Sequence, residues 1–71
     1  MFIKLINASP LHRGRPLLIR ASAILTVFEG TAVREDNTID EVTYIFSPDH
    51  GTWEVQDSAE DVHKQLTNSL L

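Results

Sequence analysis

Residues 52–70 read TWEVQDSAEDVHKQLTNSL, and within them the spacing of the apolar residues changes from two to nearly four. Before the change, Trp53 and Val55 alternate with polar residues, which is typical of a strand with one buried face. After it, apolar residues recur at three- and four-residue spacing and form one stripe along a helix. The stripe consists of Ala59, Val62, Leu66 and Leu70. The stretch therefore predicts a strand over residues 52–56 and a C-terminal amphipathic helix over residues 58–70.

The residues at the start of this helix favour the same boundary. Ser58 is a good N-cap, and Asp61 occupies the capping-box position three residues later. Asp57, Glu60 and Asp61 place negative charge at the positive end of the helix dipole. Glu60 and Lys64 form an i,i+4 pair in the favourable order. The helix is therefore predicted to begin directly after Ser58.

Four strands are predicted upstream of this junction. Each combines β-branched or aromatic residues with a boundary of turn-forming residues. They cover residues 2–6, 17–29, 31–35 and 39–47. The second is long for one strand, so we expect a break near Ala21-Ser22. Gly30 is expected to mark a bulge or a sharp bend.

Two turns are predicted between the later strands. Residues 36–38 form one, because Asp and Asn side chains bond to their own backbone and accept left-handed conformations. Residues 48–51 form the other, because Pro48 fixes φ early and Gly51 allows a positive φ late. These turns join neighbouring strands into antiparallel hairpins.

Alternation along each strand assigns its side chains to faces. Ile3 and Leu5 share one face of the first strand. Val42, Tyr44 and Phe46 share one face of the strand over residues 39–47. The pattern as a whole predicts a single α+β domain over residues 1–71. Its strands form a small antiparallel β-meander or an SH3-like partly open barrel of four to five strands, with the C-terminal α-helix covering one mouth or one sheet edge.

Composition excludes several classes of protein. The chain has 71 residues and no cysteine, which removes disulfides and thiolate metal sites. A domain this small buries only about 60% of its unfolded surface, so oligomerisation is expected to supply further burial. The N-terminus does not resemble a signal peptide, and no apolar run approaches the ~20 residues of a membrane helix. We therefore expect a cytoplasmic protein without membrane insertion.

Charge is unevenly distributed along the chain. The net charge is −4. Residues 1–34 hold five Lys or Arg and one carboxylate, while residues 35–71 hold one Lys and nine carboxylates. This asymmetry is compatible with a two-faced surface or head-to-tail association. It is also compatible with strands that fold back on one another and mix the two halves.

No residue pattern indicates catalysis, a metal or a cofactor. His12, His50 and His63 fall in a loop, a turn and the helix, without the spacing of zinc ligands. Ser47 and Asp49 lie close to His50 in sequence, but adjacent turn residues cannot build a Ser–His–carboxylate relay. The carboxylate pairs at residues 35–36 and 40–41 flank an exposed hairpin tip, and the three glycines fit no phosphate loop. We expect a protein that is not an enzyme and that holds no cofactor.

Two sets of residues are candidates for contact with a partner. The first is a basic patch on the first hairpin, formed by Lys4, His12, Arg13, Arg15 and Arg20. Such a patch can bind phosphates of nucleic acid or an acidic protein surface, including the acidic half of a second copy. The second is an apolar contact formed by Phe2 and Phe28, which are either exposed beyond the reach of the helix or part of the core.

Three stretches together carry a family resemblance. They are the opening FIKL at residues 2–5, Gly14 followed by PLLIRASAI at residues 16–24, and WEVQDSAEDV at residues 53–62. This order resembles the FlbD-like small bacterial proteins associated with flagella and swarming motility. Arg20 stands where the family pattern has Asn, and the turn at residues 48–51 replaces a turn of the Asn-Gly type. The resemblance implies a motility-associated role.

The sequence thus leads to three functional hypotheses. The first is a small non-enzymatic protein–protein interaction module of bacterial or phage origin that forms homo-oligomers. A short meander supports it because unpaired strand edges invite pairing with another chain. The second is a nucleic-acid-associated accessory protein that uses the basic patch, although a negatively charged chain departs from the usual basic profile. The third is the motility-associated role implied by the resemblance.

Overall fold

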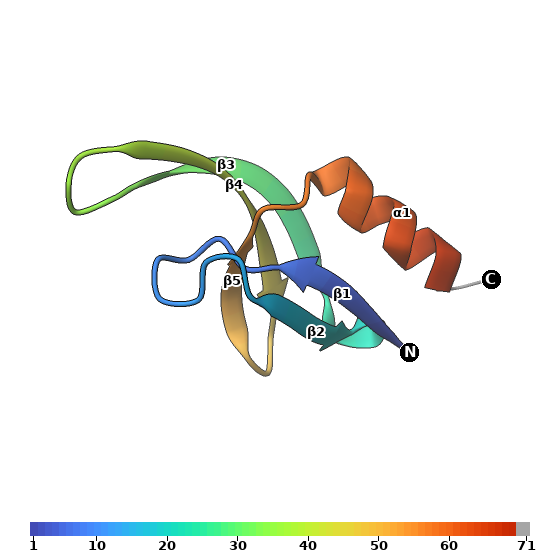
Figure 1. Ribbon diagram of the computed structural model, residues 1–71. Helices are drawn as coiled ribbons and strands as arrows, with labels where there is room; N and C mark the ends of the chain where they lie inside the picture. Colours follow the sequence, from blue (N-terminus) through green and yellow to red (C-terminus); the bar gives the residue numbers. More distant parts are fainter. Residues whose placement is uncertain (70–71) are drawn as a thin grey trace.

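The computed structural model describes residues 1–69, and it confirms the α+β layout (Figure 1). Five strands form two antiparallel sheets, and one helix follows them. The elements are β1 (Phe2–Ile6), β2 (Pro16–Arg20), β3 (Thr26–Val33), β4 (Ile39–Ser47), β5 (Gly51–Val55) and α1 (Ala59–Ser69). The arrangement is an open meander rather than a closed barrel: β1 pairs with β2, and β4 lies between β3 and β5.

The two sheets meet where β5 passes the end of β1. Asn7 and Val55 form an isolated antiparallel bridge. On either side of it, the Ala8 N–H donates to the Glu54 carbonyl at 2.9 Å and the Gln56 N–H donates to the Ile6 carbonyl at 2.7 Å. The sheets therefore curl around one shared inner face. The hairpin of β3 and β4 projects beyond this body, and α1 lies toward the opposite end (Figure 1).

The core lies on the inner face, beneath α1. Its buried members are Ile3, Leu5, Ile19, Ile45, Val55 and Val62, with Leu66 packed beside them. Val42, Tyr44 and Phe46 share one face of β4 as predicted, but Ile45 on the opposite face enters the core. β4 carries large apolar residues on both faces, so alternation alone does not identify the inner one.

The break predicted near Ala21-Ser22 is confirmed. The bulge or sharp bend predicted at Gly30 is wrong. Residues Ala21–Ala23 form a 3₁₀ turn between β2 and β3. Gly30, by contrast, lies inside β3 in regular register with Val42, without a bulge. A Cβ atom added at Gly30 would come within 3.0 Å of Tyr44 Cε2. Because that contact is tight, glycine gives the Tyr44 ring room beside β3, where the Tyr44 hydroxyl donates to the Thr31 carbonyl at 3.4 Å.

The separate strand predicted over residues 31–35 is therefore the end of β3. That strand stops at Val33 because the next residues form the hairpin turn. The Asn37 N–H donates to the Arg34 carbonyl at 2.9 Å, and Asn37 has a φ of 66°. This left-handed residue is the feature that the sequence at residues 36–38 predicted. The turn at residues 48–51 is also present, with a φ of 90° at Gly51.

The helix begins where its capping residues predicted. The Asp61 N–H donates to Ser58 Oγ at 3.1 Å, and Lys64 Nζ lies 3.6 Å from Glu60 Oε1. Val62 is fully buried and Leu66 is half-buried, so the predicted stripe faces the core. Leu70, the last member of the predicted stripe, lies outside the described residues.

Replacing Val62 with alanine tests this arrangement. Val62→Ala is expected to lower the free energy of unfolding by about 2 kcal/mol, because it leaves a cavity between the helix and both sheets. The exposed neighbour His63 gives a matched control, and His63→Ala is expected to change stability by less than about 0.5 kcal/mol. Urea unfolding measures both. Equal losses in the two variants would contradict the packing of α1 on the core.

Candidate interaction surface

The outer face of the first hairpin carries apolar and basic side chains side by side. We call Phe2, Lys4, Leu18 and Arg20 the hairpin surface. Alternation turns Ile3, Leu5 and Ile19 into the core and leaves these four on the opposite face. Phe2, the first residue of β1, is 60% exposed, and Leu18, in the middle of β2, is 65% exposed, although both side chains are large and apolar. The Arg20 guanidinium lies 5.7 Å from the centre of the Phe2 ring, in cation–π range.

Side chains of α1 and of the segment before it hold this hairpin in place by hydrogen bonds to the backbone of β1. The Lys4 N–H donates to Gln65 Oε1 at 3.3 Å, and Gln65 Nε2 donates to the Lys4 carbonyl at 3.0 Å. Two residues on, the Ile6 N–H donates to Asp57 Oδ1 at 2.7 Å. The side chain of Gln65 thus pairs with β1 as a neighbouring strand would. On the edge of β1 that faces away from β2, the backbone groups of Lys4 and the N–H of Ile6 therefore have hydrogen-bond partners.

The opposite edge of the hairpin has no such cover. The Ala21 N–H donates to the Met1 carbonyl and the Asn7 N–H donates to the Arg15 carbonyl, both at 2.9 Å. In an antiparallel pair this identifies the odd-numbered residues of β2 as those bonded to β1. The N–H and C=O groups of Leu18 and Arg20 therefore point away from β1. No other strand of residues 1–69 pairs with that side of β2.

A hollow of about 650 Å³ runs along this free edge. One wall is β2 itself, from Leu17 to Arg20, and another is the turn that contains Asp49 and His50. Trp53 of β5 also lines the hollow. The indole Nε1 of Trp53 is buried and has no hydrogen-bond partner among the described residues. The hollow therefore combines an unpaired strand edge with an aromatic side chain that holds an unused donor.

The structure separates the members of the predicted basic patch. Lys4 and Arg20 lie together on the hairpin surface, and neither forms an ion pair within residues 1–69. Arg13 instead donates to Asp40 Oδ2 at 3.1 Å. His12 lies exposed in the loop between β1 and β2, and Arg15 lies at the end of that loop, just before β2. Arg13 is thus partly neutralised, and two cations remain beside Phe2 and Leu18.

Arg34 holds the loop and was not among the predicted site residues. Its Nε donates to Asp40 Oδ2 at 2.9 Å, its Nη2 donates to the Ala8 carbonyl at 3.2 Å, and its Nη1 lies 3.0 Å from Glu54 Oε1. The hydrogen bond to Asp40 raises the pKa of Arg34, and the hydrogen bonds from Arg34 and Arg13 lower the pKa of Asp40. These contacts tie the loop to β4 and β5. Only the folded chain brings the partners together, so no local sequence signal marks them.

Phe28, the second member of the predicted apolar contact, lies on a different sheet from Phe2. Its ring stacks on Tyr44 with centroids 5.2 Å apart, on the outer face of β3 and β4. It is 50% exposed. Both phenylalanines are therefore exposed, but they belong to separate apolar areas.

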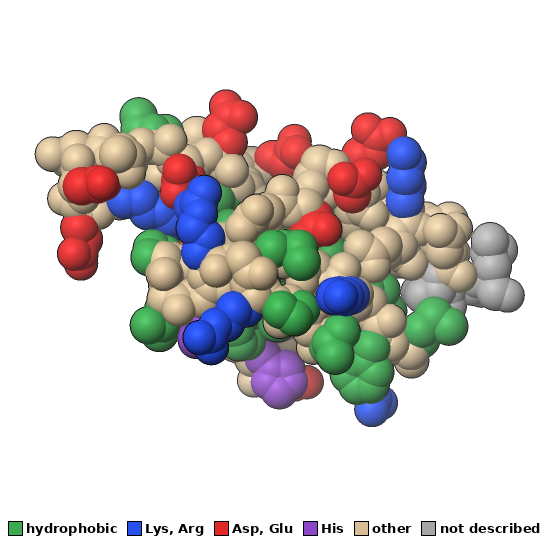
Figure 2. All heavy atoms as spheres, viewed as in Figure 1, with side chains coloured by type: hydrophobic (Ala, Val, Ile, Leu, Met, Phe, Trp, Pro, Cys, Tyr) green, Lys and Arg blue, Asp and Glu red, His purple; other side chains and the backbone are tan. Residues whose placement is uncertain are grey.

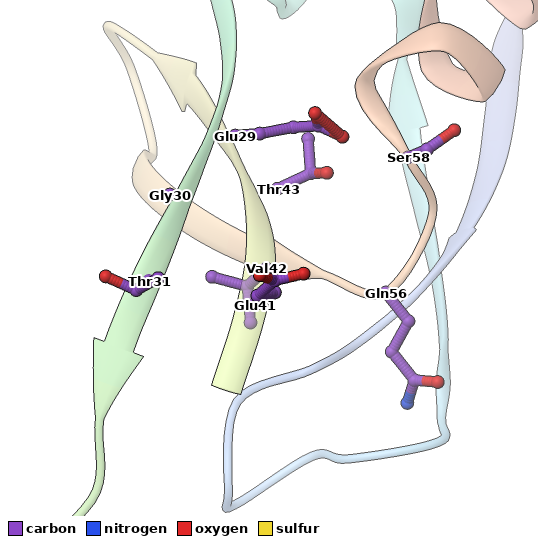
Figure 3. Close-up of a pocket in the computed structure, with 8 residues that line it drawn as sticks. All are labelled: Glu29, Gly30, Thr31, Glu41, Val42, Thr43, Gln56 and Ser58. Atoms are coloured by element: carbon purple, nitrogen blue, oxygen red, sulfur yellow. The ribbon is translucent and has the colours of Figure 1, made fainter. Parts of the chain in front are cut away.

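A polar hollow of about 410 Å³ lies between the β3–β4 hairpin and the start of α1 (Figure 3). Glu29, Thr31, Glu41 and Thr43 line it from the strands, and Ser58 lies across from them. Glu29 Oε2 accepts a hydrogen bond of 3.4 Å from the Ala59 N–H, which assigns this carboxylate to the helix start. No cluster of three or more metal-ligating side chains occurs in the described part of the chain. The hollow thus offers two carboxylates and three hydroxyls, and no histidine or lysine is among the residues that line it.

Comparison with known proteins gives no family assignment. The chain matches no family model, and it has no significant match among curated proteins or solved structures. Within residues 1–69, no helix has the length and apolar character needed to cross a membrane.

The pairing of Arg34 with Asp40 predicts a pH dependence of stability. Because the folded pKa of Asp40 lies below its usual 3.8, the stability that this ionised carboxylate contributes is complete above about pH 4 and is lost as the pH falls through the folded pKa. Asp40→Asn is expected to lower the melting temperature near pH 7, and the difference from the native chain should shrink toward about pH 2.5. Thermal unfolding followed by circular dichroism across this range measures it. A difference that stays constant with pH would contradict the role of Asp40.

Proposed function

We propose that this chain is a small non-enzymatic protein–protein interaction module that self-associates through its hairpin surface. The observation that carries the proposal is the exposure of Phe2 and Leu18 beside the unpaired cations Lys4 and Arg20. Apolar side chains rimmed by charge are characteristic of protein contact sites. Gln65 fixes the hairpin in place, so a partner binds it without a large ordering cost.

The distribution of charge supports a second copy as the partner. Arg13 and Arg34 mix the two halves of the chain through their ion pairs with Asp40 and Glu54. In the view of Figure 2, most acidic side chains lie along one side of the molecule, over the β3–β4 hairpin and the start of α1, whereas many hydrophobic side chains and one acidic side chain lie on the opposite side. The hairpin surface of one copy is therefore complementary in charge to the acidic side of another.

The same observations give less support to the nucleic-acid hypothesis. Arg13 is engaged by Asp40, and the net charge is −4. Three cations of the predicted basic patch, Lys4, Arg15 and Arg20, form no ion pair within residues 1–69, and three such groups supply few of the phosphate contacts on which nucleic-acid binding depends. A bacterial or phage origin remains part of the proposal, and the FlbD-like resemblance favours a motility-associated setting.

Substitutions on the hairpin surface test the proposal. In the Phe2→Ser, Leu18→Ser double variant, the association constant between copies is expected to fall at least about tenfold, because each buried apolar side chain contributes about 1.5–3 kcal/mol. Sedimentation velocity over a range of protein concentrations measures the association. Leu11→Ser is the matched control, since Leu11 is 82% exposed in the loop outside the hairpin surface.

Two outcomes of the sedimentation measurement would contradict the proposal. A native chain that sediments as a monomer at every concentration would refute self-association. Equal association in the double variant and in Leu11→Ser would show that copies meet at another surface. All three substituted residues are exposed, so the melting temperature of each chain should remain close to that of the native protein.

A further inference from the structure

The free edge of β2 presents backbone groups in a spacing that suits an extended chain. Leu18 and Arg20 lie two residues apart and direct their N–H and C=O groups to the same side of the strand. A further strand can use all four groups, as in proteins that bind peptides by strand addition. Pro16 lacks an N–H, so this register ends at the start of β2.

The hollow beside this edge determines which side chain of an added strand can point toward the inner face. A residue placed opposite Ile19 points to the same face as Ile19, because paired residues share a face of the sheet. Ile19 points to the inner side, where Trp53 lines the hollow. An apolar side chain is favoured at this position, since it would cover the half-buried indole ring.

The hairpin surface determines the two neighbouring positions. Residues placed opposite Leu18 and Arg20 point outward, beside those side chains. Leu18 is 65% exposed and favours an apolar neighbour. Arg20 forms no ion pair in the described chain, and its guanidinium lies 5.7 Å from the centre of the Phe2 ring, so a carboxylate placed opposite it is complementary in charge.

We propose that the β2 edge binds an extended acidic and apolar segment of a protein partner as an added antiparallel strand. From its N-terminus the segment carries an acidic residue opposite Arg20, an apolar residue facing Trp53, and an apolar residue opposite Leu18. The inference rests on the proposed function, because it assigns a ligand to the hairpin surface. It also states which part of the partner's chemistry is recognised.

A short peptide tests this recognition directly. The probe is acetyl-Thr-Glu-Leu-Val-Thr-amide, titrated into the full chain while the emission of Trp53 is recorded. Trp53 is the only tryptophan, so its emission reports the hollow alone. We expect a saturable change in emission, and at least about tenfold weaker binding when the peptide carries Lys in place of Glu. The absence of any saturable change would overturn the inference.

Two substitutions at Arg20 separate the backbone edge from the charge. Arg20 has a φ of −66° and a ψ of 127°, which proline adopts without strain, and its N–H points to the free edge. Arg20→Pro therefore removes an edge donor while the pairing of β2 with β1 is retained. Arg20→Ala removes only the side chain.

With a peptide that carries Gln in place of Glu, Arg20→Ala should bind as the native chain does. Arg20→Pro should bind at least about tenfold more weakly than Arg20→Ala. Comparable melting temperatures of the two variants exclude unfolding as the cause. Equal peptide binding by the two variants would show that the backbone edge is not used.

The outcome is distinguishable from a failure of the proposed function. If the chain self-associates through Phe2 and Leu18 but does not bind the peptide, the proposed function stands and the added strand is refuted. If the chain is a monomer but binds the peptide, and the two Arg20 variants differ as expected, the added strand stands and self-association is refuted.

Discussion

The backbone of a strand must find hydrogen-bond partners on both of its edges or leave one edge to water, and the first hairpin meets this requirement on one edge only. On the β1 side, Gln65 and Asp57 supply side-chain partners, and Gln56 supplies a backbone donor. On the β2 side, no strand of residues 1–69 pairs with the outward-facing backbone groups of Leu18 and Arg20. The position of the helix creates this asymmetry, because α1 can cover only one edge of the hairpin while it also covers the core.

Packing and hydrogen bonding in α1 therefore serve the same purpose. Val62 is buried against the inner face, and the helix that it fixes carries Gln65 to the backbone of Lys4. At the other end of the hairpin, Arg34 holds the connecting loop through the Ala8 carbonyl. The hairpin is thus anchored at both ends by elements that are distant in sequence. A rigid hairpin with one open edge follows from these contacts.

Local signals predicted much of the fold, and long-range contacts account for what they missed. Ser58 caps the helix and Asn37 adopts its left-handed turn because neighbours in sequence determine both conformations. A bulge was wrongly predicted at Gly30, because the feature that favours glycine there is the ring of Tyr44 on the neighbouring strand. The members of the basic patch were predicted by residue type alone, which cannot show that Asp40 engages Arg13. The sequence also could not predict that β2 has a free edge, because which strands lie at an edge depends on the order of strands in the sheet.

The exposure of Phe2 and Leu18 follows from the side of the first hairpin on which α1 lies. The single α-helix of residues 1–69 lies on the inner face, where Val62 is buried. Side chains on the outer face of β1 and β2 therefore have no strand or helix of residues 1–69 packed above them. Polar residues would fill these positions if water were their only neighbour, because strands with one solvated face alternate in that way. Large apolar residues lie there instead, which is the observation behind the proposed contact with a partner.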